Sequence, residues 1–263
     1  MRDGAGTPAI GERKEMFMTQ KLTAILFDLD GTLLPMEQEA FIKRYFGLLA
    51  RTCAPLGLPK KELIPAVWAG TEAMVKNDGA ALNHDRFWDT FAAALGDRVR
   101  AMEPAFDRFY GEEFHGAREA TRPNPLAAEC VRVLKDKGYR LVLATNPLFP
   151  PVGVESRMSW AGLKPEDFER ITHYNNSHYC KPNPAYFREI FEQTGIDPAE
   201  SLMVGNDARE DLCAAQLGCG TYLVTDCLEH GEDIPAAPVE GTVSLRGSMA
   251  DFRAWVDGLP DCR

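Results

Sequence analysis

The stretch AILFDLDGTLLP, residues 24–35, ends an apolar run on a carboxylate. Four apolar residues lead directly into Asp28, a second carboxylate follows at Asp30, and Gly31 breaks the run. Two carboxylates this close repel each other and are costly to desolvate unless a positive charge compensates them. The stretch therefore predicts a buried strand that ends at a cation or at a reaction site.

The composition is that of an ordinary globular protein with excess negative charge. The chain has 263 residues, of which 45% are hydrophobic and 26% charged, and its formal net charge is −10. This charge argues against nucleic acid or an anionic membrane as a general partner. No apolar run has the length of a membrane-spanning helix. An anionic substrate would need local cations or a metal ion to bind.

Two further features bear on the setting of the protein. Residues 1–20 lack the apolar core of a secretory signal and predict a disordered leader. The seven cysteines are scattered and form no CxxC pair, which argues against a zinc site and against a disulfide framework. These features predict a cytoplasmic protein. We expect it to be a monomer or a weak homodimer.

Four short apolar runs predict the strands of a parallel sheet: LTAILF (22–27), RLVLAT (140–145), SLMVG (201–205) and GTYLV (220–224). Each is nearly continuous in hydrophobicity, as expected of strands buried on both faces. Segments 124–138, 183–195 and 206–218 begin with Asn, end at Gly and predict helices. The alternation of strand and helix predicts an open α/β sheet.

Residues 35–122 interrupt this alternation, because they carry helical patterns only. Apolar residues recur there at helical spacing, as at Phe41, Tyr45 and Leu48. The block predicts an inserted helical subdomain joined at residues 34–36 and 118–123, which leaves 21–34 and 123–263 as the core. We interpret its later aromatic residues as bundle core rather than as a cofactor site: Phe106, Phe109, Tyr110 and Phe114.

Polar residues follow other predicted strands besides the first. Ligands bind beyond the carboxyl ends of the strands in an open α/β sheet. The residues expected to meet Asp28 at that edge are Thr145, Asn146, Lys181, Asn206, Asp207 and Asp211. Singly, each has an ordinary explanation, since Asp207 could cap a helix and Lys181 could be a solvated loop cation. Four groups in order, each after an apolar run, predict a functional site.

In this order the motifs resemble those of the haloacid dehalogenase (HAD) superfamily of hydrolases. The matching stretches are DLDGT (28–32), ATN (144–146), CKPNP (180–184) and GNDAREDL (205–212). The resemblance extends from about residue 22 to about residue 220. It implies a Rossmann-like, doubly wound core and an α-helical cap of the C1 type at the position of the insertion.

The resemblance also implies catalytic roles. Asp28 would be the nucleophile that forms an aspartyl-phosphate, and Asp30 the general acid and then the general base. Gly31 would allow the turn that brings Asp30 back over Asp28. The Thr145 side chain and the Asn146 N–H would hold the phosphoryl oxygens.

Charge compensation at such a site is implied to come from two sources. Lys181 would neutralise the nucleophile and the phosphate together. A Mg²⁺ ion would be held by Asp28, the backbone carbonyl of Asp30, Asp207 and Asn206. Asp211 would orient Lys181 or a metal-bound water.

The implied activity is hydrolysis of a small phosphorylated metabolite, a phosphate monoester. Asp30 argues against the dehalogenase and phosphonatase branches, which lack a carboxylate there. A sugar-phosphate mutase shares the whole set of residues, and a non-catalytic phospho-ligand-binding domain shares the fold, so both alternatives stay open. Four further polar residues are interpreted as surface or capping residues rather than substrate contacts: Arg122, His84, Asn77 and His178.

Overall fold

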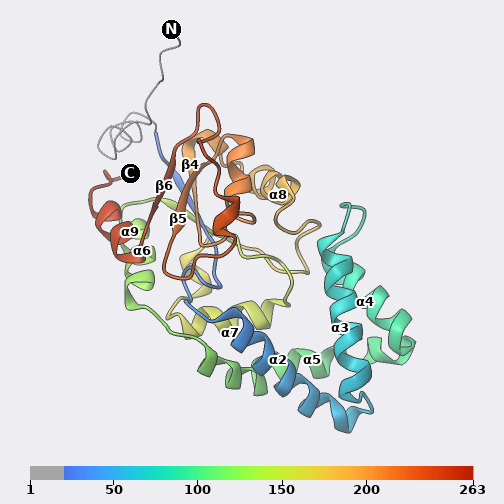
Figure 1. The fold of residues 1–263 in the computed structure, drawn as a ribbon. Coiled ribbons are helices and arrows are strands. Elements are labelled where there is room, and N and C mark those ends of the chain that lie inside the picture. Colours follow the sequence, from blue (N-terminus) through green and yellow to red (C-terminus); the bar gives the residue numbers. More distant parts are fainter. Residues whose placement is uncertain (1–20, 263) are drawn as a thin grey trace.

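A six-stranded parallel sheet forms the centre of the molecule (Figure 1). This computed structural model describes residues 21–262, so the predicted leader lies outside the described residues. The strand order is β3-β2-β1-β4-β5-β6, which is that of a doubly wound sheet and confirms the predicted fold class. The strands are β1 (Ala24–Phe27), β2 (Arg140–Leu143), β3 (Arg170–Ile171), β4 (Ser201–Gly205), β5 (Gly220–Val224) and β6 (Ser244–Gly247).

The register of the central strands aligns their carboxyl ends. Phe27 at the end of β1 is level with Leu143 of β2 on one side and with Val204 of β4 on the other. The strand order reverses at β1, where a ligand site is expected. Side chains of β1 alternate between the two faces, with Phe27 in one buried cluster and Leu26 in the other. Burial on both faces explains the continuous apolar runs.

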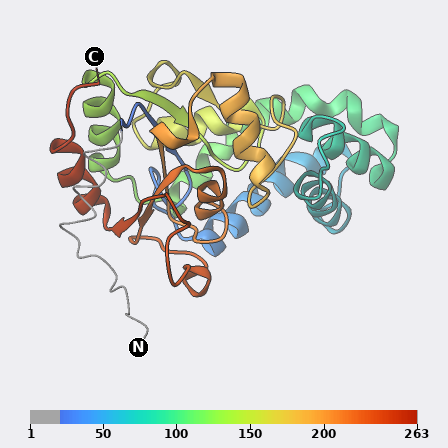
Figure 2. The same ribbon diagram turned by 90° about the horizontal axis from the view of Figure 1, so that it is seen from above.

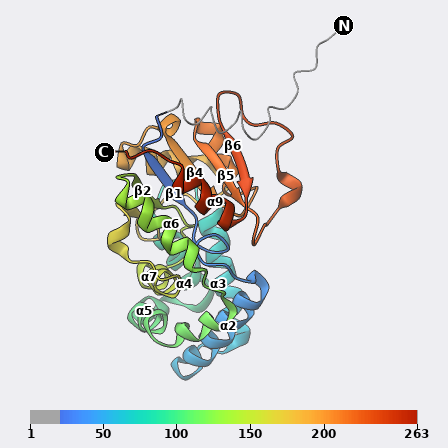
Figure 3. The same cartoon turned by 90° about the vertical axis from the view of Figure 1, so that its left-hand side faces the viewer.

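Helices cover both faces of the sheet. Figure 3 shows α6 (Pro125–Asp136) and α9 (Met249–Asp257) in front of one face. The other face buries its cluster against α8 (Pro184–Thr194) and the 3-10 helix η6 (Leu212–Leu217). The remaining core helices are α7 (Pro151–Trp160), η4 (Pro165–Asp167), η5 (Pro198–Glu200) and η7 (Gly231–Asp233).

Two of the three predicted core helices begin where the sequence indicates. Asn124 and Asn183 cap α6 and α8, each accepting a backbone N–H with its side chain. The helix predicted over residues 206–218 is wrong in its first half, because η6 begins only at Leu212. Asp207 accepts the N–H groups of Arg209 and Glu210, and this holds the preceding segment as a turn.

The insertion between β1 and α6 is helical. It contains α2 (Gln38–Cys53), η1 (Ala54–Leu56), α3 (Lys60–Val75), α4 (Asn83–Leu95), η2 (Asp97–Met102), α5 (Glu103–Gly111) and η3 (Glu113–Ala120). Its two connections meet at an antiparallel bridge between Met36 and Thr121. Figure 2 shows the insertion, in blue to green, extending away from α9. In residues 21–262 no helix combines the length and apolar character needed to cross a bilayer.

Packing of α3 on α4 gives a test of the insertion. A Cβ at Gly70 of α3 would lie 2.6 Å from the Phe87 ring of α4, whereas a Cβ at Gly47 of α2 has no atom within 4 Å. We expect Gly70→Ala to lower the free energy of unfolding by about 1 kcal/mol, since overpacking outweighs the gain in helix propensity.

The matched control is Gly47→Ala, which should raise the free energy of unfolding by about 0.5–1 kcal/mol through helix propensity alone. Urea unfolding followed by circular dichroism measures both variants. Equal effects of the two substitutions would contradict the packing described for α3 and α4.

Candidate active site

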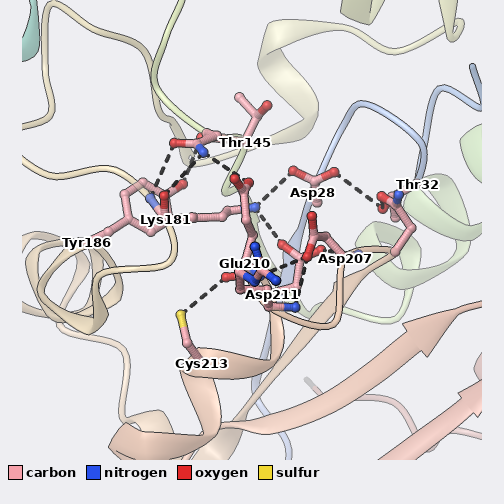
Figure 4. A network of polar contacts seen from close by, with 12 residues as sticks. Asp28, Thr32, Thr145, Lys181, Tyr186, Asp207, Glu210, Asp211 and Cys213 are labelled. Atoms are coloured by element: carbon pink, nitrogen blue, oxygen red, sulfur yellow. Dashed lines mark hydrogen bonds and ion pairs between the residues drawn. The ribbon is translucent and has the colours of Figure 1, made fainter. Parts of the chain in front are cut away.

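The predicted site residues converge at the carboxyl ends of β1, β2 and β4 (Figure 4). Asp28 directly follows β1, and Thr145 follows β2 by two positions. Lys181 was expected at a strand end, but it lies in the long loop between β3 and α8. Residues 173–180 form turns rather than a strand, because the side chain of Asn176 accepts the N–H of His173 and closes the loop locally.

Lys181 is the central cation of this cluster. Its Nζ lies 2.9 Å from Asp28 Oδ1 and 2.6 Å from Asp211 Oδ1, and its side chain is 0% exposed. Burial alone would lower the pKa of Lys181, but Asp211 and Asp28 outweigh it and raise that pKa well above its usual value. Lys181 therefore stays charged. Asp211 was expected to orient either Lys181 or a metal-bound water, and the structure places it in contact with Lys181.

Two glycines allow the polar groups to approach so closely. A Cβ at Gly205 would lie 2.0 Å from Oδ2 of Asp211, so any larger residue would displace the carboxylate that holds Lys181. Gly31 has a φ of +84°, and a Cβ there would lie 2.4 Å from Asn206 Nδ2. Both positions therefore require glycine, one for space and the other for space and backbone conformation.

Asn146 and Thr145 join the cluster from β2. The Asn146 amide donates to Glu210 Oε2 at 2.9 Å and accepts the Lys181 N–H at 3.3 Å, so it links the loops after β2, β3 and β4. The Thr145 carbonyl accepts a hydrogen bond from the hydroxyl of Tyr186 at 2.9 Å. Thr145 also lines a cavity that lies at this edge of the sheet, and Asp28 lines the same cavity.

The loops after β4 and β5 bring together a second group of side chains that could bind a metal ion. Asp207 Oδ2 lies 2.8 Å from His230 Nδ1, and the carboxylate of Glu229 is close enough for all three side chains to hold one metal ion. Asn206 accepts the Thr32 hydroxyl at 2.7 Å and so ties this loop to the turn after β1. Asp207 and Asn206 were predicted here from the sequence, whereas Glu229 and His230 were not.

The donor set of the cavity fits a divalent cation. Six carboxylates line it: Asp28, Asp30, Asp207, Glu210, Asp211 and Glu229. Burial raises the pKa of Glu210 to about 7 and also raises the pKa of Glu229, and the nearby Asp207 carboxylate adds to both rises. Carboxylate oxygens are the ligands that Mg²⁺ and Ca²⁺ prefer.

Asp30 has a buried partner that sequence reasoning missed. Its Oδ2 forms an ion pair with Arg157 of α7, whose side chain is 1% exposed. The guanidinium also donates to the Gly153 carbonyl and lies 4.1 Å from the centre of the Phe149 ring. Among the described residues, Asp30 Oδ1 and Arg157 Nη2 have no hydrogen-bond partner. Burial raises the pKa of Asp30, and Arg157 opposes this rise.

None of the four residues set aside as surface or capping residues lines the cavity. His84 lies 2.7 Å from Glu103, His178 lies 2.6 Å from Glu189, Asn77 donates to Ala81, and the Arg122 N–H donates to Pro35. By contrast, Phe106 and Tyr110, interpreted from the sequence as bundle core, line the cavity while also being buried.

Comparisons with known proteins agree with this architecture. A family model described as haloacid dehalogenase-like hydrolase matches residues 22–218. A phosphoglycolate phosphatase of Vibrio vulnificus is 28% identical over 233 residues, covering 88% of this chain and 96% of its own. The pyrophosphatase PpaX of Bacillus velezensis is 26% identical over 220 residues, covering 83% and 91%. The crystal structure of a HAD phosphatase from Thermococcus onnurineus superposes with a TM-score of 0.56 at 19% identity, covering 91% and 100%.

The pair of Asp30 and Arg157 can be tested by a double-mutant cycle. Arg157→Met leaves the Asp30 carboxylate buried without a partner, so we expect the free energy of unfolding to fall by about 3 kcal/mol. Adding Asp30→Asn should recover at least half of that loss, since the uncompensated charge is then gone.

The control is Arg209→Met, which removes an ion pair to Asp233 in which both side chains are more than one third exposed. Its cost should stay below about 1 kcal/mol. Chemical denaturation measures all variants. Equal costs for Arg157→Met and Arg209→Met would show that the buried pair does not form as described.

Proposed function

The chain belongs to the haloacid dehalogenase-like hydrolases, and from that premise we propose that it is a Mg²⁺-dependent phosphatase of small phosphate monoesters. The observation that carries the proposal is the position of Asp28. Its side chain lines the cavity, and its Oδ1 contacts the ammonium group of the buried Lys181. The similarity to a phosphoglycolate phosphatase and a pyrophosphatase supports phosphoryl chemistry at this position.

Asp28 acts as the nucleophile in this proposal. Its carboxylate attacks phosphorus, the bond from phosphorus to the alcohol oxygen breaks, and an aspartyl-phosphate forms. Asp30 gives its proton to the departing alcohol and then takes one from the water that attacks the aspartyl-phosphate. This second attack releases phosphate and restores Asp28. Arg157 holds the Asp30 carboxylate toward the cavity during both steps.

Positive charge and hydrogen-bond donors hold the phosphoryl group. Lys181 offsets the charge of Asp28 as the dianionic phosphate approaches, and Asp211 fixes the direction of its ammonium group. The Thr145 hydroxyl and the Asn146 N–H bind phosphoryl oxygens from the side of β2. Water is excluded by the insertion, which we propose to act as a cap over the cavity.

Mg²⁺ belongs to the proposal because the acidic lining exceeds the cations that face it. Asp28, the carbonyl of Asp30, Asp207 and Asn206 would hold the ion. The ion would supply charge neutralisation for the transferring phosphoryl group. All seven cysteines are free thiols, which supports the proposal that the protein works in a reducing cytoplasm.

The role of Asp28 predicts loss of turnover in Asp28→Asn. The variant keeps the size of the side chain but removes the nucleophile, so kcat should fall by at least about 1,000-fold. Phosphate release from p-nitrophenyl phosphate measures the rate. Asp89→Asn, which alters an exposed ion pair with Arg100, serves as the control and should keep its activity.

A fold check by circular dichroism accompanies the Asp28→Asn assay. A folded Asp28→Asn protein that retains a rate within tenfold of the unchanged enzyme would remove Asp28 from the role of nucleophile.

The acidic lining predicts metal dependence. Treatment with EDTA followed by buffer exchange should abolish phosphate release, and added Mg²⁺ should restore it, since the excess carboxylates then again bind a compensating cation. Calorimetric titration of the EDTA-treated protein with Mg²⁺ gives a readout independent of activity. Full turnover in the EDTA-treated protein without added metal would contradict this part of the proposal.

A further inference from the structure

A single cavity of about 270 Å³ joins the catalytic carboxylates to the interior of the insertion. Its two ends differ in chemistry. The end formed by the sheet carries the six carboxylates, whereas the end formed by the insertion is lined by twelve residues of which none is charged. Ten of these twelve are aliphatic or aromatic, and the other two are Gln38 and Thr71.

Three of the polar side chains in the apolar half, Tyr45, Tyr110 and Thr71, already form hydrogen bonds. The hydroxyls of Tyr45 and Tyr110 lie 2.8 Å apart and form a hydrogen bond. The Thr71 hydroxyl donates to the Val67 carbonyl of its own helix at 2.9 Å. A bound group in this half therefore meets mainly apolar surface and ring faces, and the uncharged groups left to it for hydrogen bonding include the Gln38 amide and the Trp88 indole N–H, which has no partner among the described residues.

Cations are missing from the part of the cavity that would receive the leaving group. Among the described lining residues, His230 alone can carry a positive charge, and it lies at the acidic end beside Asp207. Three arginines of the insertion form ion pairs on its surface instead: Arg44 with Glu119, Arg86 with Asp78, and Arg100 with Asp89.

This distribution decides which alcohols fit. A carboxylate or a second phosphate on the leaving group would lose its hydration in the apolar half without gaining an opposite charge, which is strongly unfavourable. An uncharged hydrocarbon or aromatic group instead gains free energy by leaving water and by contact with rings such as Phe46 and Trp88.

We propose, on the basis of the function proposed above, that the substrate is a phosphate monoester of an uncharged aliphatic or aromatic alcohol. The phosphate binds at the acidic end, where Lys181 and a metal ion compensate it, and the hydrocarbon part of the alcohol occupies the space between α2, α3 and α4. This assignment sets the chain apart from enzymes whose leaving group is anionic, such as phosphoglycolate and pyrophosphate hydrolases.

A series of n-alkyl phosphates from ethyl to hexyl tests the assignment, because the reactivity of the leaving group changes little along it while its apolar area grows. We expect kcat/KM with Mg²⁺ to rise about fourfold for each added methylene. 2-Phenylethyl phosphate should exceed 2-phosphoglycolate by about 100-fold or more, and pyrophosphate should be an equally poor substrate.

The matched variants are Thr71→Lys, which places a cation in the apolar half, and Thr90→Lys, which adds the same charge on α4 away from the cavity. Thr71→Lys should lower kcat/KM for hexyl phosphate at least about tenfold and raise it for 2-phosphoglycolate. Thr90→Lys should leave both values unchanged.

The outcomes separate this inference from the function beneath it. Phosphate release that is equal along the alkyl series, or fastest with 2-phosphoglycolate or pyrophosphate, would overturn the inference and leave the phosphatase in place. Absence of release from every ester in the presence of Mg²⁺ would overturn the proposed function itself. A matching effect of Thr90→Lys would show that the apolar half does not select the substrate.

Discussion

The ammonium group of Lys181 is buried between the carboxylates of Asp28 and Asp211, and the site depends on this contact. Burying any of these charges alone would cost several kcal/mol, so each is tolerated only because the others are present. The surrounding chain fixes the three groups independently. Gly205 leaves room for Asp211. The Asn146 side chain accepts the backbone N–H of Lys181, and this holds the residue where its ammonium group reaches both carboxylates. Because Asp28 directly follows a strand in the middle of the sheet, its backbone cannot move to escape the charges around it.

The topology gives the cavity its two different ends. Parallel strands bring the residues that follow β1, β2 and β4 to one edge, and polar groups can be placed there without interrupting the buried runs behind them. The insertion follows β1 in the sequence, and its two connections to the core meet at the bridge between Met36 and Thr121. Its helices therefore stand at the same edge and contribute apolar side chains to the acidic site. One cavity thus combines a charged surface from the core with an uncharged surface from the insertion.

Sequence reasoning succeeded where local chemistry decides the structure. The four apolar runs predicted the inner strands because burial on both faces leaves a continuous signal, and Asn124 and Asn183 marked helix starts because capping is local. It missed β3, which has only two residues, and β6, whose residues are not fully buried. Arg157 lies 127 positions from Asp30, so nothing near either residue announces the pair, although an arginine between Val154 and Met158 on a buried helix face was a usable signal. The placement of Glu229 and His230 beside Asp207 likewise depends on a return of the chain after β5.

The apolar half of the cavity also bears on how a two-step hydrolysis can proceed. With the proposed alcohol in the space beside α3, little water would reach Asp28, and the low polarity of the walls would strengthen the attraction between Lys181 and the phosphoryl group. The proposed second step needs water at the same place, and departure of the alcohol would admit it, since that space is connected to the carboxylates. In the proposed mechanism Asp30 would then accept a proton from this water, while the ion pair with Arg157 would keep its carboxylate in position. In this proposal the same apolar lining that would select the alcohol would also order the two steps, because water would enter only after the leaving group has gone.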